Sequence, residues 1–137
     1  MENLWENWFI KLFIKLNIMF KSIRTVVYKV ADLQKAKDWY TILLGIEPYF
    51  DKPFYVGFNI NDYELGLDPD MENVSYGTSV VTYWQVDDIE QAKLDILNHD
   101  GSLYKEILDV GGAVKVAEFK DPFGNMIGII EDKSFKK

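Results

Sequence analysis

Val27-Tyr-Lys-Val-Ala-Asp-Leu-Gln-Lys-Ala-Lys37 is echoed by Tyr83-Trp-Gln-Val-Asp-Asp-Ile-Glu-Gln-Ala-Lys93, and the offset is constant, because 83 − 27 and 93 − 37 both give 56. Gly45 and Gly101 keep the same offset. A repeat of this length indicates one supersecondary unit used twice. Two units are too few for a solenoid, so we expect both copies to pack in one domain and to enclose a cleft.

Each copy is predicted to be a β-α-β-β-β unit. Asp32 and Asp88 are expected to cap the two helices, over 34–44 and up to residue 97, and Gly45 and Gly101 to end them. The expected strands are 23–30, one near Tyr49, 54–60 and 63–67 in the first copy, and 80–86, 104–110, 114–119 and 126–130 in the second. Turns are expected at 51–53 and 111–112.

The predicted class is therefore α+β: two βαβββ modules related by a pseudo-twofold axis, with curved mixed sheets around a cleft. Residues 19–137 would form this single domain. Its first module spans about 21–67, a polar linker spans 68–78, and the second module spans about 79–132.

Residues 1–18 differ from the rest and are predicted to form an amphipathic helix or an extension. Its apolar face would carry Leu4, Trp5, Trp8, Phe9, Leu12 and Phe13. Lysines interrupt the apolar run, so neither a signal peptide nor a membrane span is expected. We expect the aromatic face to lie on protein, because in water it would form an unusually large apolar patch.

The composition excludes some classes of function. Fifteen basic and 22 acidic residues give the 137-residue chain a net charge of −7. An acidic chain without a basic run is a poor candidate for nucleic-acid binding, which depends on clustered Lys and Arg. The absence of cysteine excludes disulfides and thiolate metal sites, and it agrees with a cytoplasmic location.

The repeat, together with Asp121-Pro-Phe-Gly-Asn-Met-Ile-Gly-Ile-Ile130, resembles the vicinal oxygen chelate (VOC) superfamily over about residues 21–132. This superfamily includes glyoxalase I, extradiol dioxygenases, and the fosfomycin- and bleomycin-resistance proteins. The resemblance implies paired modules around a cleft and, commonly, a homodimer. It says little about activity, because one fold hosts many functions.

The resemblance also implies a divalent metal, held by the first strand and a late strand of each copy. By motif, these positions are Thr25, Glu64, Val81 and Gly128. Only Glu64 offers a charged ligand, so we expect the other three positions to be vacated and the cleft to hold no metal and no cofactor. The one histidine, His99, is expected to cap a helix end rather than to bind metal.

Strand alternation predicts which side chains face the cleft. Tyr28, Val30, Trp84 and Val86 should pack under the helices, and the opposite faces should carry Lys29, Glu64, Tyr83 and Gln85. Such a mixture of aromatic, aliphatic and polar groups suits a small organic ligand, so these four residues are the candidate ligand contacts. Glu64 is the one candidate catalytic base, unless it is paired with Lys29 or a backbone amide.

Three functions remain open on the sequence. The favoured one is a metal-independent protein of the bleomycin-resistance type, rather than an enzyme, with a small organic ligand in the cleft between or beside the modules. The second is a VOC-type lyase, isomerase or dioxygenase-like enzyme that uses Glu64 with an atypical metal or in proton transfer. The third is an interaction module that uses the N-terminal helix.

Overall fold

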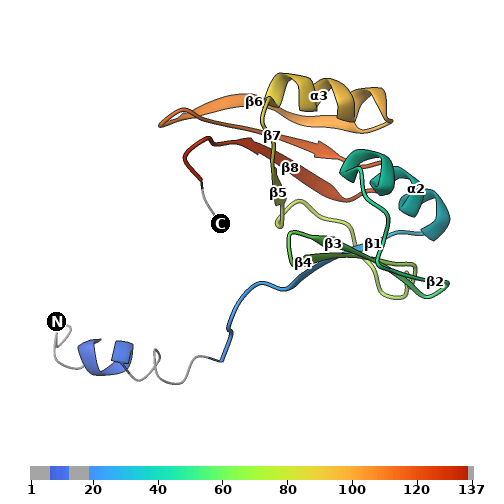
Figure 1. The fold of residues 1–137 in the computed structure, drawn as a ribbon, viewed down its shortest axis with the longest axis horizontal. Coiled ribbons are helices and arrows are strands. Elements are labelled where there is room, and N and C mark those ends of the chain that lie inside the picture. The colour runs from blue at the N-terminus through green and yellow to red at the C-terminus, as the bar shows by residue number, and fades with distance from the viewer. Residues whose placement is uncertain (1–6, 13–18, 136–137) are drawn as a thin grey trace.

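Two four-stranded sheets form the domain in the computed structural model, which describes residues 7–12 and 19–135 (Figure 1). The first sheet has the order β1-β4-β3-β2 and the second the order β5-β8-β7-β6. The first module contains β1 (Thr25–Lys29), α2 (Leu33–Leu44), β2 (Phe50–Lys52), β3 (Tyr55–Ile60) and β4 (Tyr63–Asp68). The second contains β5 (Thr82–Gln85), α3 (Ile89–Asn98), β6 (Ser102–Gly111), β7 (Val114–Lys120) and β8 (Met126–Glu131). The predicted α+β fold of two βαβββ modules is confirmed.

The strand register shows which positions of the two modules correspond. β1 pairs with β4, and β5 with β8, in parallel, while the other pairs are antiparallel. Val27 lies opposite Gly66, and Tyr83 lies opposite Gly128. The offset is thus 83 − 27 = 56 on the first strands but 128 − 66 = 62 on the last ones. Five of the six additional residues lie before β7, where the ten-residue β6 replaces the three-residue β2, because 118 − 57 = 61. The sixth lies in the turn between β7 and β8.

The helix caps confirm part of the sequence prediction. Asp32 accepts a hydrogen bond from the Lys35 amide at 3.0 Å, and Asp88 accepts one from the Gln91 amide at 3.1 Å. Gly45 ends α2 in the left-handed region, with φ 67°, where glycine has no steric penalty. In α3 the cap is His99, as expected for this histidine.

Two local predictions are wrong. Gly101 does not end α3, because the left-handed residue there is Asp100, with φ 68°. Gly101 is needed instead for space, since a Cβ at this position would overlap Ile96. The predicted turn at 51–53 begins too early: Asp51 and Lys52 pair with β3, and the turn follows them.

One core joins the helix-facing sides of both sheets. Its most buried side chains are Val30, Val56, Phe58, Leu65, Leu67, Ile89 and Phe119. Those of β3 and β4 alternate along their strands, as period-two patterning requires, whereas Ile89 begins α3. Tyr28 is also buried, and Trp84 and Val86 pack against this core as partly buried residues, so the predicted helix-facing positions are confirmed.

Asp121 links the modules at the Asp-Pro-Phe-Gly-Asn turn. The Tyr40 hydroxyl on α2 donates to its carboxylate at 2.5 Å, and the backbone amides of Phe123 and Asn125 also donate to it. The Asn125 amide group donates to the Lys29 carbonyl at 3.0 Å. Burial raises the pKa of Asp121, although these hydrogen bonds oppose the shift. This turn is therefore a structural joint between the modules.

Of the chain before β1, the described residues 7–12 and 19–24 lie away from the two sheets in Figure 1. Residues 7–12 are helical, and Trp8 is 62% exposed. Phe9 and Leu12 are exposed too, so the described part of the predicted aromatic face does not pack on its own domain. Leu4, Trp5 and Phe13 lie outside the described residues. Within residues 7–12 and 19–135, no helix has the length and apolar character that crossing a membrane demands.

Candidate functional site

Each sheet has one face turned away from the core, which we call its open face. In the first sheet this face carries Thr25, Val27, Lys29, Tyr55, Gly57, Glu64, Gly66 and Asp68, because the intervening residues of β1, β3 and β4 point into the core. In the second sheet the open face carries Tyr83 on β5, Gly128 on β8 and Glu118 on β7, which lie side by side in the strand register. The candidate site residues named from the sequence lie on these two faces.

Glu64 is the centre of a hydrogen-bonded cluster on the first sheet. Its Oε1 atom accepts the Tyr55 hydroxyl at 2.7 Å and the Thr25 hydroxyl at 3.3 Å. Its Oε2 atom accepts the Tyr49 hydroxyl. Arg24 Nη1 lies 3.7 Å from Oε1, and the Glu64 side chain is only 11% exposed. The hydroxyl donors come from β1, β3 and the segment before β2, so the carboxylate ties these parts of the chain together.

This cluster favours the ionised form of the Glu64 carboxyl group. Burial by itself would raise the pKa of Glu64, but the hydrogen bonds from Tyr49, Tyr55 and Thr25, together with Arg24, outweigh burial and lower it. The pKa of Tyr55 is raised, first by burial and then by its bond to Glu64. A carboxylate with a lowered pKa and occupied oxygens is a weak general base.

Two glycines make room for the tyrosine rings. A Cβ on Gly57 would lie 2.9 Å from Glu64 Oε2 and 3.2 Å from Tyr49 Cε1. A Cβ on Gly66 would overlap the Tyr55 hydroxyl. Neither glycine has a positive φ, so space rather than backbone conformation explains both. Tyr49 and Tyr55 therefore lie across the sheet surface where other residues would project side chains.

The second sheet has a different open face. A Cβ on Gly128 would lie 2.5 Å from Tyr83 Cδ1 and 2.9 Å from Val81 Cγ1, so the Tyr83 ring covers this glycine. By register, the first-module counterpart of Gly128 is Gly66, and the counterpart of Glu64 is Met126, since 64 + 62 = 126. Glu118 lies opposite Gly128 on β7, and its carboxylate pairs with Lys105 at 3.5 Å.

The four candidate ligand contacts are not gathered in one place. Lys29 pairs with Asp68 at 2.7 Å rather than with Glu64. Lys29 and Thr25, the strand partner of Glu64, are four residues apart on β1, about 13 Å at a rise of about 3.3 Å per residue. Gln85 donates to the Asp132 carbonyl at 2.8 Å. Lys29 and Glu64 thus belong to the first sheet, and Tyr83 and Gln85 to the second.

The sequence interpretation missed Tyr49, Tyr55 and Arg24. Tyr55 and Gly57 are two residues apart in β3, so strand alternation places them on the same face of the sheet. This alternation was sufficient to predict that Tyr55 lies on the open face. Tyr49 lies outside any strand, and no periodicity indicates that its hydroxyl reaches Glu64.

The residues present do not fit a transition metal. Zinc and similar ions need several donors that converge at about 2 Å. Thr25, Glu64, Val81 and Gly128 supply one carboxylate and one hydroxyl, and both already bond to each other. Across residues 7–12 and 19–135, no group of three or more His, Cys, Asp or Glu side chains is placed to hold an ion.

Two paired βαβββ modules, each with an open sheet face, are the architecture of the VOC superfamily, which the sequence resembles. A family model covers residues 22–129 of the chain, and the chain belongs to this family, the Glyoxalase/Bleomycin resistance protein/Dioxygenase superfamily. No curated protein sequence matches the chain significantly.

Solved structures show the same fold at low sequence identity. A glyoxalase/bleomycin resistance protein/dioxygenase family enzyme from Burkholderia phytofirmans PsJN is 14% identical, with a TM-score of 0.70 over 81% of this chain and 98% of that one. A glyoxalase/bleomycin resistance protein from Albidiferax ferrireducens T118 is 21% identical, with a TM-score of 0.63 over 80% and 98%. Lactoylglutathione lyase from Agrobacterium tumefaciens is 16% identical, with a TM-score of 0.64 over 85% and 99%. At these identities the likeness concerns the fold alone.

Proposed function

We propose that this chain is a metal-independent binding protein for a small organic molecule, which lies against the open faces of the sheets. The observation that carries the proposal is the engagement of Glu64: three hydroxyls bond to its two oxygens, and Arg24 lies beside them. Such a carboxylate has little remaining capacity to coordinate a metal or to accept a substrate proton. Binding is the function that these faces retain.

Exposed aromatic rings indicate the kind of ligand. Tyr83 is 45% exposed above Gly128, and Tyr49 is 59% exposed beside Glu64. Rings that lie across a sheet offer a flat surface, on which a planar organic molecule stacks favourably. Lys29 lies on the open face of the first sheet and Gln85 on that of the second, so each sheet offers both an aromatic ring and a polar side chain. The proposed ligand is therefore flat and largely apolar, with hydrogen-bonding groups at its edge.

We further propose that the protein acts as a homodimer in the cytoplasm. Leu103, Leu108 and Val110 on β6 are exposed, and a twofold partner would cover apolar surface of this kind. The cysteine-free sequence supports a reducing compartment. Light scattering should give twice the chain mass of 16.0 kDa. A monomer mass throughout the micromolar range would contradict the dimer.

Native mass spectrometry followed by mutagenesis tests the binding proposal. Protein purified without chelators should retain an organic ligand and no metal, and the ligand should be lost in Tyr83→Ala but kept in Tyr83→Phe, which preserves the ring. Trp8→Ala is the control, because Trp8 is also an exposed aromatic residue but lies in the helical segment before the domain. Ligand retention in Tyr83→Ala, or equal losses in Tyr83→Ala and Trp8→Ala, would contradict a role for the open faces.

A further inference from the structure

We infer that the protein has a second binding site, for an amphiphilic organic cation, in the hollow between the two modules. This hollow lies on the helix-facing side of the sheets, so the inference does not depend on the proposed role of the open faces. Its volume is about 380 Å³, and typical small-molecule sites have volumes of roughly 300–1,000 Å³.

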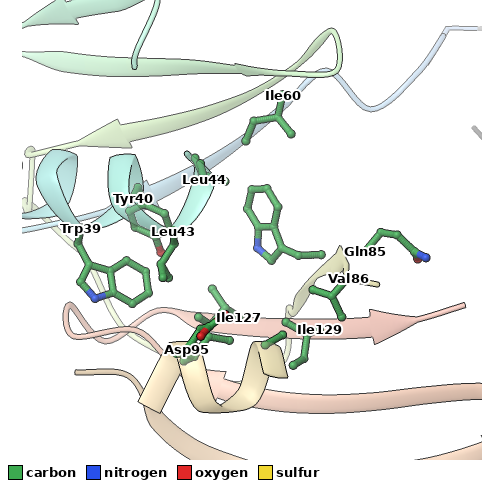
Figure 2. A pocket seen from close by; sticks show the side chains of 13 residues that line it. Trp39, Tyr40, Leu43, Leu44, Ile60, Gln85, Val86, Asp95, Ile127 and Ile129 are labelled. Carbon is green, nitrogen blue, oxygen red and sulfur yellow. The ribbon is translucent and has the colours of Figure 1, made fainter. Parts of the chain in front are cut away.

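Apolar side chains from both modules wall the hollow. Figure 2 shows Leu43, Leu44 and Ile60 of the first module on one side and Val86 and Ile129 of the second on the other. The aromatic ring of Trp84, which is only partly buried, also lines it. An apolar group that enters the hollow would thus remove hydrocarbon surface from water on both sides.

The rim of the hollow is negatively charged. Asp95 lines the hollow, and a shallow groove continues from it to Asp87 and Asp88. Among the described residues that line the hollow and the groove, none is Lys, Arg or His. Three aspartates, with no basic residue among the described residues that line the hollow and the groove, favour a cation over a neutral or anionic molecule.

Shape and charge together select one class of ligand. The apolar part of the molecule would occupy the hollow, and its positive group would stay at the rim near Asp95 and the groove. The Trp84 ring adds a surface that attracts cations as well as hydrocarbon. Quaternary or protonated amines with an aromatic or branched apolar body meet these requirements.

A pair of isosteric probes separates charge from shape. Benzyltrimethylammonium carries a nitrogen where neopentylbenzene carries a carbon, so the two differ mainly in charge. Titrated into the full chain, the cation should shift the indole NMR signals of Trp39 and Trp84, which line the hollow, and leave that of Trp8 in place. We expect the cation to bind about tenfold more tightly than the neutral probe.

Two aspartates provide a matched pair of variants. Asp95 accepts a hydrogen bond from Gln91 one helical turn away, and Asp38 on α2 accepts the same bond from Gln34. Asp95→Asn and Asp38→Asn therefore make the same local change and the same change in net charge, but only Asp95 lines the hollow. Asp95→Asn should lower the affinity for the cation about fivefold, and Asp38→Asn should leave this affinity unchanged.

Blocking the hollow completes the test. Ala92→Leu on α3 and Ile60→Phe on β3 should each fill the space and abolish the shifts of Trp84, with an otherwise native amide spectrum. If one variant fails to fold, the other decides. Tyr83→Ala should leave cation binding unchanged, which separates this site from the open faces. Equal binding of both probes, equal effects of the two aspartate variants, or binding that survives a filled hollow would overturn the inference.

Discussion

The two modules follow one plan on their helix-facing sides and diverge on their open faces. Leu65 and Ile127, and likewise Leu67 and Ile129, occupy equivalent buried positions in β4 and β8. On the open faces, Glu64 with its hydroxyl donors has Met126 as its counterpart. The shared core needs an apolar residue at each helix-facing position, whereas the open faces are free to differ. A functional difference between the modules must therefore be sought on the open faces.

The largest effect is expected where the second module contacts the first. Asp121→Ala would leave the buried Tyr40 hydroxyl and two backbone amides without their acceptor. We expect a loss of about 3 kcal/mol in the free energy of unfolding, because unsatisfied buried donors cost more than a typical hydrogen bond gains. Urea denaturation measures it. If Asp121→Ala loses less unfolding free energy than Glu64→Ala, Asp121 contributes less to stability than Glu64, and this prediction is wrong.

Glu64 and Glu118 compare the two open faces directly. Their side chains are 11% and 12% exposed, but Glu64 has three hydroxyl donors and Arg24, whereas among the described residues Glu118 pairs with the exposed Lys105 alone. We expect Glu64→Ala to cost about 2 kcal/mol in unfolding free energy and Glu118→Ala less than about 1 kcal/mol. Equal losses in urea denaturation would show that the hydroxyl cluster contributes no more than a surface ion pair.

The glycines under the tyrosine rings sharpen the same comparison. In Gly66→Ala the new methyl group would displace Tyr55, which is half-buried and bonded to Glu64. In Gly128→Ala it would meet Tyr83, a ring exposed enough to turn away. Thermal unfolding should show a loss of about 1.5 kcal/mol for the first and less than about 1 kcal/mol for the second. The reverse order would mean that Tyr83, not Tyr55, is the fixed ring.

The pH dependence of stability gives the smallest expected signal. The folded state lowers the pKa of Glu64 below its ordinary value of 4.5, so ionised Glu64 stabilises the fold above that value, and this stabilisation is lost as the pH falls through the lowered pKa. The difference in unfolding free energy between the native chain and Glu64→Gln should therefore shrink from neutral pH to strongly acidic pH. A difference that grows on acidification would contradict the assigned sign.

The sequence predicted the fold better than the site because the two depend on different information. The repeat and period-two burial determine the modules, and both are visible in the spacing of residues such as Val30 and Val86. The same pattern predicted that Glu64 lies on the open face of its strand, but it did not predict the residues that bond to Glu64. Tyr49 reaches it from outside the strands, and Lys29 finds Asp68 directly across the β1–β4 pair. Such contacts depend on register and side-chain direction, which one sequence does not encode locally.

Metal binding to the full chain tests the central claim most directly. The claim is that the Glu64 cluster replaces a metal centre with hydrogen bonds from Tyr49, Tyr55 and Thr25. Protein purified without chelators should be mixed with an equivalent of zinc, nickel or ferrous iron, exchanged into metal-free buffer and weighed by native mass spectrometry. The account predicts a mass without metal in every case. A stoichiometric metal adduct that disappears in Glu64→Ala would contradict it.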